Sequence, residues 1–143
     1  MQRTATAVWM GALKDGKGTL STQSGVLADT PYSFATRFEG QKGTNPEELI
    51  GAAHAGCFTM ALSAQLGTMN LTPQSLRTTA AVTLEKLEAG WTISKIHLDV
   101  SARIPGISPA AFESAAASAK ANCPVSRLFK AEITMTASLE QAA

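Results

Sequence analysis

Hydrophobic and polar residues alternate in several short segments of this chain, and alternation of this kind is typical of half-buried β-strands. In the first third, residues 2–9 and Ser33–Phe38 follow the pattern, and Asp15-Gly16 between them is a hairpin turn signal. Later in the chain, the same reasoning predicts strands over Leu76–Leu87, Trp91–Ile104 and Ala131–Leu139.

A long helix is predicted from Asn45, which can cap it, to about Leu66, with Gly67 as its stop. Pro46 suits the first helical position, and Glu47 and Glu48 meet the positive end of the helix dipole. The helix is apolar or small nearly all round, which predicts that it is buried at the centre of the protein or of an interface.

A second helix is predicted after the Ser108 cap, from Pro109 to about Asn122, and a short third helix from Pro124 to Lys130. Strands joined in hairpins, with two main helices between them, indicate an α+β fold with mostly antiparallel sheets. We expect residues 1–143 to form a single domain, because this length fits one hydrophobic core.

Composition narrows the possible partners. The 12 basic and 11 acidic side chains leave a formal net charge of +1, whereas nucleic acids and membrane surfaces attract a basic excess gathered on one face. We expect neither partner. The apolar run Leu49–Leu66 is interrupted by His54 and is expected to be too short and too mild to span a bilayer. With no apolar signal segment at the start, a cytoplasmic location is expected.

The two cysteines are the main candidates for chemistry. Cys57 lies in the middle of the long helix, where burial alone would raise its pKa and make it inert. A reactive thiolate there needs a nearby positive charge, and the candidates are Arg37, Arg127 and His54. Cys123 precedes Pro124 and would sit at a helix N-terminus, where a thiolate is favoured. Two buried, inert thiols remain the alternative reading.

His54 lies one turn before Cys57 on the same helix face. It is either a hydrogen-bonded core histidine or a functional neighbour of the thiol. A metal site is a third option, but zinc takes three or four protein ligands, and the chain offers few beyond His54, His97 and the two cysteines. We therefore expect no metal.

The stretch GTNPEELIGAAHAGCFTMALS and the later NCPVSRLF closely resemble the osmotically inducible protein C (OsmC) family, which includes the organic hydroperoxide resistance proteins. The resemblance covers essentially the whole chain and extends to the early segment that ends near Arg37. His54 in AAHAGCF is similar to the OsmC branch, since the organic hydroperoxide resistance branch usually has an aromatic residue there.

The resemblance implies a peroxidase that forms an intertwined homodimer. It places Cys57 on the peroxidatic cysteine, Cys123 on the resolving cysteine, Arg37 on the arginine that activates the thiolate, and Glu47 on the glutamate that holds that arginine. It also implies a role in the response to oxidative and osmotic stress. No cofactor is implied, and the expected reductant is an external dithiol or a lipoylated protein.

Helix geometry adds one expectation about the dimer. Glu47 and Cys57 are ten residues apart on the long helix, or about 15 Å along its axis. One arginine can hardly hold Glu47 and also reach Cys57 of the same helix. Two copies crossing antiparallel near Ala52, where the residues are small, would place the partner's Glu47 beside each Cys57–Cys123 pair. Which chain supplies Arg37 stays open.

The alternatives to an enzyme are a non-catalytic domain, which senses redox state or binds a lipid-like ligand, and a purely structural stress protein. Phe34, Phe38, Phe58 and Met60 are either plain core or the lining of an apolar pocket. Such a pocket would favour organic hydroperoxides over hydrogen peroxide.

Overall fold

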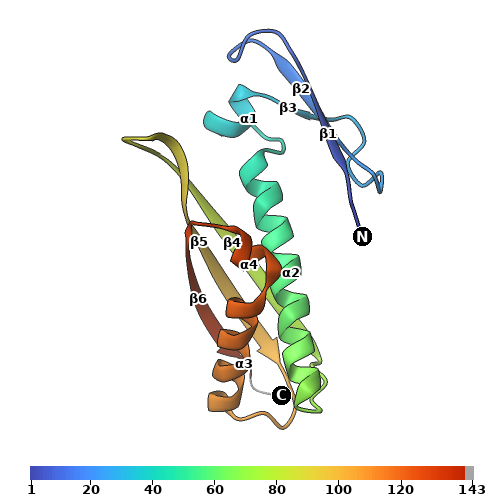
Figure 1. Ribbon diagram of the computed structural model, residues 1–143, viewed down its shortest axis with the longest axis vertical. Coiled ribbons are helices and arrows are strands. Elements are labelled where there is room, and N and C mark those ends of the chain that lie inside the picture. The colour runs from blue at the N-terminus through green and yellow to red at the C-terminus, as the bar shows by residue number, and fades with distance from the viewer. Residues whose placement is uncertain (141–143) are drawn as a thin grey trace. The chain divides into compact units, whose positions relative to one another are not determined.

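The computed structural model describes residues 1–140, whose contacts divide them into two units, residues 1–49 and the residues from Ile50 onward. Figure 1 shows the helices and strands of both units. The expected single domain over residues 1–143 stays a prediction.

The first unit contains a small antiparallel sheet. Its strands are β1 (Ala5–Met10), β2 (Lys17–Thr22) and β3 (Thr30–Tyr32), in the order β1-β2-β3. Met10 pairs with Lys17 across the predicted hairpin. The rings of Trp9 and Tyr32 lie 5.4 Å apart, and a Cβ at Gly18 would overlap both. Glycine at this position therefore lets the two aromatic rings pack over the sheet.

Helix α1 (Phe34–Phe38) replaces the strand that the alternating pattern predicted over Ser33–Phe38, so that prediction is wrong. The cause is a capping box: the Ser33 hydroxyl accepts the Thr36 N–H at 3.2 Å, and the Thr36 hydroxyl accepts the Ser33 N–H at 3.0 Å. Phe34 and Phe38, four residues apart, meet with ring centroids 4.8 Å apart. Arg37 consequently lies on a helix and not on a strand.

Helix α2 (Pro46–Thr68) begins as predicted, with the Asn45 side chain accepting the Glu48 N–H at 2.8 Å. It does not stop at Gly67. The helix ends at Thr68 and the turn closes two residues after it, where Asn70 takes the left-handed conformation with φ 56° and the Leu71 N–H donates to the Leu66 carbonyl at 3.0 Å. Asparagine tolerates that conformation, so Gly67 remains inside the helix.

Only one face of α2 is buried in the described chain. Residues at helical spacing form the buried stripe, namely Gly51, His54, Phe58, Leu62 and Leu66, whereas the opposite face of small residues and Met60 is exposed. The expectation of a helix buried all round is not met within one chain. By length and composition alone α2 could cross a membrane, a test that the core helix of a globular protein also passes.

The second unit is built on a sheet of three strands, β4 (Ser75–Leu87), β5 (Gly90–Arg103) and β6 (Glu132–Leu139). β4 and β5 pair antiparallel, and β5 and β6 pair parallel. The strand predictions hold within one or two residues at each end, and the α+β class with mostly antiparallel pairing is confirmed.

Helices α3 (Pro109–Asn122) and α4 (Pro124–Leu128) connect β5 to β6. The Ser108 hydroxyl caps α3 by accepting the Ala111 N–H at 3.2 Å, as predicted. Alternate β5 residues (Ile96, Leu98, Val100) are fully buried with Phe58 of α2 and Phe112 of α3 in one core. Helices α2 and α3 therefore pack on the same face of the sheet (Figure 1).

Candidate active site

The fold brings the two cysteines together. Cys57 is half-buried on α2, and Cys123 is fully buried in the core, at the junction of α3 and α4. Both thiols are free, and each shifts the pKa of the other, so they lie close together. The sequence spacing alone did not indicate this proximity, because the residues lie on elements that are far apart along the chain.

The two thiols have opposite electrostatic environments. Burial raises the pKa of Cys57; the Val125 backbone amide opposes this, and the neighbouring Cys123 adds to it. Burial would also raise the pKa of Cys123, but the Ser126 amide, the Cys57 thiol, the Ser126 hydroxyl and the Val125 amide outweigh it and lower the pKa. The Cys123 side chain accepts no regular capping hydrogen bond at the start of α4. The Val125 and Ser126 amides nevertheless favour the thiolate of Cys123.

His54 is joined to this site through a residue that the sequence analysis did not single out. His54 is 0% exposed, and its Nε2 lies 2.8 Å from the Ser126 hydroxyl. Ser126 is itself buried on α4, and its hydroxyl also acts on the Cys123 sulfur. Its position three residues after Cys123, in the first turn of a helix opened by Pro124, was the available signal.

Arg37 and Glu47 form the other predicted pair. The guanidinium grips the carboxylate with both Nε and Nη2, at 3.2 Å and 2.7 Å from Oε1. The Glu47 side chain is 11% exposed and the Arg37 side chain 35%. A charge-assisted, two-bonded contact of this kind fixes the orientation of the guanidinium plane.

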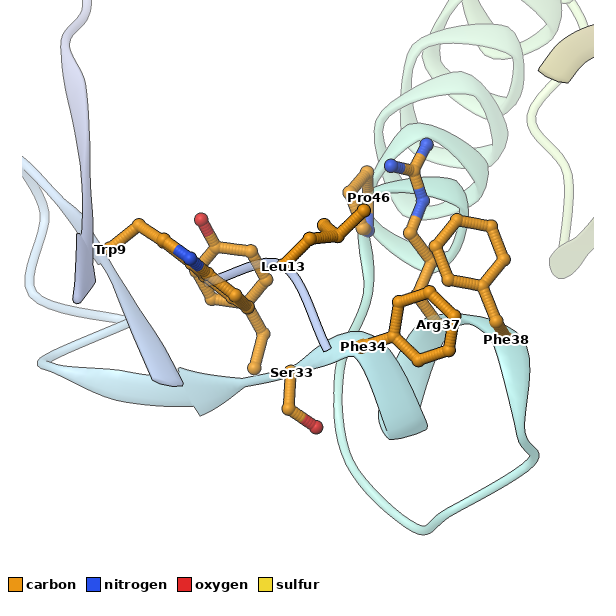
Figure 2. A pocket seen from close by; sticks show the side chains of 8 residues that line it. Trp9, Leu13, Ser33, Phe34, Arg37, Phe38 and Pro46 are labelled. Atoms are coloured by element: carbon orange, nitrogen blue, oxygen red, sulfur yellow. The ribbon is translucent and has the colours of Figure 1, made fainter. Parts of the chain in front are cut away.

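A cavity of about 260 Å³ lies beside this ion pair, within the first unit. Its lining is mostly aromatic and apolar: Trp9, Leu13, Tyr32, Phe34, Phe38 and Pro46, with Ser33 and Arg37. Figure 2 shows the rings of Phe34 and Phe38 beside Arg37, whose guanidinium carbon is 5.1 Å from the centroid of Phe38. The site therefore offers one oriented cation next to an apolar hollow.

The two predicted pairs belong to different units of the chain, the ion pair to residues 1–49 and the thiols to the residues from Ile50 onward. The groups within residues 50–140 that set the pKa of Cys57 include no cation. Arg127, another candidate, is exposed on α4. Among residues 1–140, no three His, Cys, Asp or Glu side chains gather as ligands for a metal ion.

Comparison with known families identifies the chain. The model of the OsmC-like protein family matches residues 39–138. The chain belongs to the OsmC family. It is 58% identical, over 129 residues that make up 90% of each chain, to the peroxiredoxin OsmC of Escherichia coli K12 and, to the same extent, to that of Shigella flexneri. The resemblance seen in the two cysteine motifs is thereby confirmed.

Solved structures share the fold of this OsmC-family chain. The organic hydroperoxide resistance protein OhrB of Bacillus subtilis superposes with a TM-score of 0.68, at 24% identity over 96% of this chain and 98% of its own. An OsmC-like protein from Mycoplasma pneumoniae reaches 0.77 at 14% identity, over 99% of each chain. The α+β, OsmC-like fold expected from the sequence is therefore correct.

Proposed function

We propose that this OsmC-family protein is a thiol peroxidase that reduces organic hydroperoxides, and hydrogen peroxide more weakly. The observation that carries the proposal is that Cys57 and Cys123, two free thiols from separate elements, lie close enough in a partly buried site to shift each other's pKa. Relatives named peroxiredoxin, at 58% identity, support the same activity.

The reaction follows from thiol chemistry. The Cys57 thiolate attacks the terminal peroxide oxygen, the O–O bond breaks, and the alcohol leaves after taking up a proton. Cys57 becomes a sulfenic acid. Cys123 then condenses with it to a disulfide and releases water, which protects Cys57 from irreversible oxidation. A dithiol reductant reopens the disulfide by exchange. Cys57 is assigned to the first step because it is the more accessible thiol.

The first step needs a cation, because burial raises the pKa of Cys57. Arg37, held by Glu47, is our candidate for this charge and for the donor to the peroxide oxygens. α2 is continuous from Pro46 to Thr68, so Glu47 and Cys57 lie about 15 Å apart along it. We therefore assign the charge at each Cys57 to Arg37 of the partner subunit, which arrives with its own Glu47.

The exposed face of α2 supports a homodimer. Ala52, Ala53, Gly56 and Ala64 are exposed there, and Met60 is 77% exposed. Small residues allow two helices to approach closely, and an apolar helix left open to water on one side is typical of an interface. An antiparallel crossing of two α2 helices would cover this face and complete both sites.

The apolar cavity beside Arg37 supports an organic substrate. Trp9, Phe34 and Phe38 line it, and burial of a hydrocarbon group contributes about 0.8 kcal/mol per methylene. Hydrogen peroxide has no such group. We assign the reducing equivalents to a small dithiol or a lipoylated protein, with no resident cofactor, and the location to the cytoplasm.

Turnover of cumene hydroperoxide with a dithiol tests the proposal. We expect wild type to consume peroxide continuously, Cys57→Ser to consume none, and Cys123→Ser to be oxidised once and then to over-oxidise, as read by intact mass. Ser118→Ala on α3 is the control, since its hydroxyl accepts a hydrogen bond from the Asn122 side chain of the same helix. Unchanged turnover in Cys57→Ser would refute the assignment. Stoichiometric oxidation of wild type without turnover would instead identify a redox sensor.

A further inference from the structure

The peroxidase chemistry proposed above leaves one buried ionisable group without a role. His54 is 0% exposed, lies among core residues, and packs its ring edge-on against Phe129 at 5.6 Å. Its Nδ1 has no hydrogen-bonding partner among the described residues. An unpaired buried polar atom costs about 1–3 kcal/mol. A position kept for packing alone would be better filled by an apolar side chain.

The other ring nitrogen of His54, Nε2, is linked to the cysteine site through Ser126. Nε2 lies 2.8 Å from the Ser126 hydroxyl, across 72 positions of sequence. Ser126 lies in the first turn of α4, whose N-cap is Cys123, and the same hydroxyl is among the groups that lower the pKa of Cys123. The thiols of Cys123 and Cys57 in turn shift each other's pKa. Four side chains from α2, α4 and the turn before α4 therefore form one continuous line: His54, Ser126, Cys123, Cys57.

The line is isolated from other charges. The β5 side chains that face the helices are apolar, whereas His97 and Asp99 alternate with them and lie on the other face of the sheet. Lys120 of α3 is engaged with the Ile133 carbonyl. Arg127 and Lys130, on and after α4, are exposed. Within residues 50–140, the titratable groups joined to His54 are thus the two cysteines.

We propose that Ser126 and His54 form a proton relay that serves the second half of the reaction, the attack of Cys123 on the oxidised Cys57. Ser126 is the catalytic residue, because its hydroxyl touches the reacting sulfur. His54 is the positioning residue behind it, which orients the hydroxyl and holds the proton. The inference rests on the proposed peroxidase function of the same site.

The step balances as follows. The Cys123 thiol gives its proton to the Ser126 oxygen while the Ser126 hydroxyl gives its own to His54 Nε2. The Cys123 thiolate attacks the sulfur of the Cys57 sulfenic acid, an S–S bond forms, and the S–O bond breaks. The departing hydroxide takes the proton back from the imidazolium through Ser126 and leaves as water. Cys57 is reduced from sulfenic acid to disulfide, and Cys123 is oxidised from thiol to disulfide.

Electrostatics agree with this assignment. Burial lowers the pKa of His54, so the imidazole is neutral and available as a proton acceptor at neutral pH. Hydrogen bonds that include the Ser126 hydroxyl lower the pKa of Cys123 against the effect of its burial. The lowered pKa of Cys123 favours its thiolate in the second step, and the neutral His54 imidazole is free to hold the proton until hydroxide departs.

Single-turnover kinetics test the relay. Reduced protein is mixed with one equivalent of cumene hydroperoxide, quenched with an alkylating reagent, and resolved by intact mass into dithiol, sulfenic acid and disulfide. In Ser126→Ala we expect the disulfide to form about 10²-fold more slowly once Cys57 has been oxidised, the low end for general acid–base catalysis. Ser126→Thr keeps the hydroxyl and should restore the step. Ser118→Ala is the matched control.

His54→Gln gives a second readout. Glutamine can still hydrogen-bond to Ser126 but takes up no proton, so disulfide formation should slow and become more dependent on pH than in wild type. The rate of Cys57 oxidation in each variant reports whether the site is intact. Disulfide formation at the wild-type rate and pH profile in both Ser126→Ala and His54→Gln would overturn the relay and leave the peroxidase standing. Failure of wild type to oxidise Cys57 would overturn both.

Discussion

Replacing His54 with glutamine should change how the stability of the protein depends on pH. The imidazole is fully buried, and burial lowers its pKa from the ordinary value of 6.5. As the pH falls below about 6.5, the unfolded chain takes up a proton at this residue while the folded protein does not. Wild type therefore loses stability in this window, down to the lowered pKa of the folded state, and a glutamine variant lacks that contribution.

The magnitude follows from proton linkage. One proton bound by the unfolded state and not by the folded state lowers the free energy of unfolding by up to about 1.4 kcal/mol per pH unit. At neutral pH, His54→Gln should be the less stable protein by about 1 kcal/mol, because it loses the ring contact with Phe129. As the pH is lowered, this difference should shrink and then reverse.

Urea unfolding followed by far-ultraviolet circular dichroism measures the effect at a series of pH values. Protein concentration must be constant, since a dimer links stability to concentration, and a reductant must keep both thiols free. His97 is present in both proteins and cancels in the comparison. Free energies of unfolding that run parallel between about pH 7.5 and pH 5.5 would contradict a neutral, buried His54, and with it a premise of the proton relay.

Three further changes test other parts of the structure. Arg37→Lys keeps the charge but not the two-bonded grip on the carboxylate, so peroxide oxidation of the attacking thiol should slow by about 10²-fold in stopped-flow measurements; an unaltered rate would exclude a role for that grip. Met60→Glu puts charge on the exposed face of α2 and should yield monomers in light scattering with little peroxidase activity, whereas an active dimer would place the interface elsewhere. Gly67→Ala should raise the free energy of urea unfolding by up to about 1 kcal/mol, because a Cβ there meets nothing within 4 Å. Gly51→Ala should not raise it, because its Cβ would lie 3.2 Å from a β4 carbonyl oxygen.

Helix starts and long strands were predictable because their signals are local. Asn45 and Ser108 cap the two main helices as expected. The exception among starts is α1, where the alternation of Phe34, Thr36 and Phe38 suits a strand, but the reciprocal hydrogen bonds of Ser33 and Thr36 outweigh it. Five residues are too few for periodicity to separate the two structures.

The candidate site was predictable only in parts. Cys57, Cys123, Arg37 and Glu47 stand out through their motifs, whereas their contacts depend on tertiary packing. The family resemblance implied the Arg37–Glu47 pair and the partnership of the two thiols, and the structure adds the geometry of the ion pair and the opposite pKa shifts of the thiols. Ser126 carries no motif of its own, so its link to His54 depends on the placement of α4 against α2.

The opposite environments of the two thiols imply a division of labour between the halves of the reaction. In residues 50–140 the pKa of Cys57 is raised and that of Cys123 is lowered. The proton therefore stays on Cys57, the sulfur that must be a thiolate to attack peroxide first. In the proposed dimer, a paired guanidinium from a second subunit would supply an external cation near Cys57 and reverse this order. Once Cys57 is a sulfenic acid, it no longer competes for the proton. The surroundings of Cys123 then suit the second step without any rearrangement, which is why we assign the cation to peroxide attack and the His54–Ser126 pair to disulfide formation.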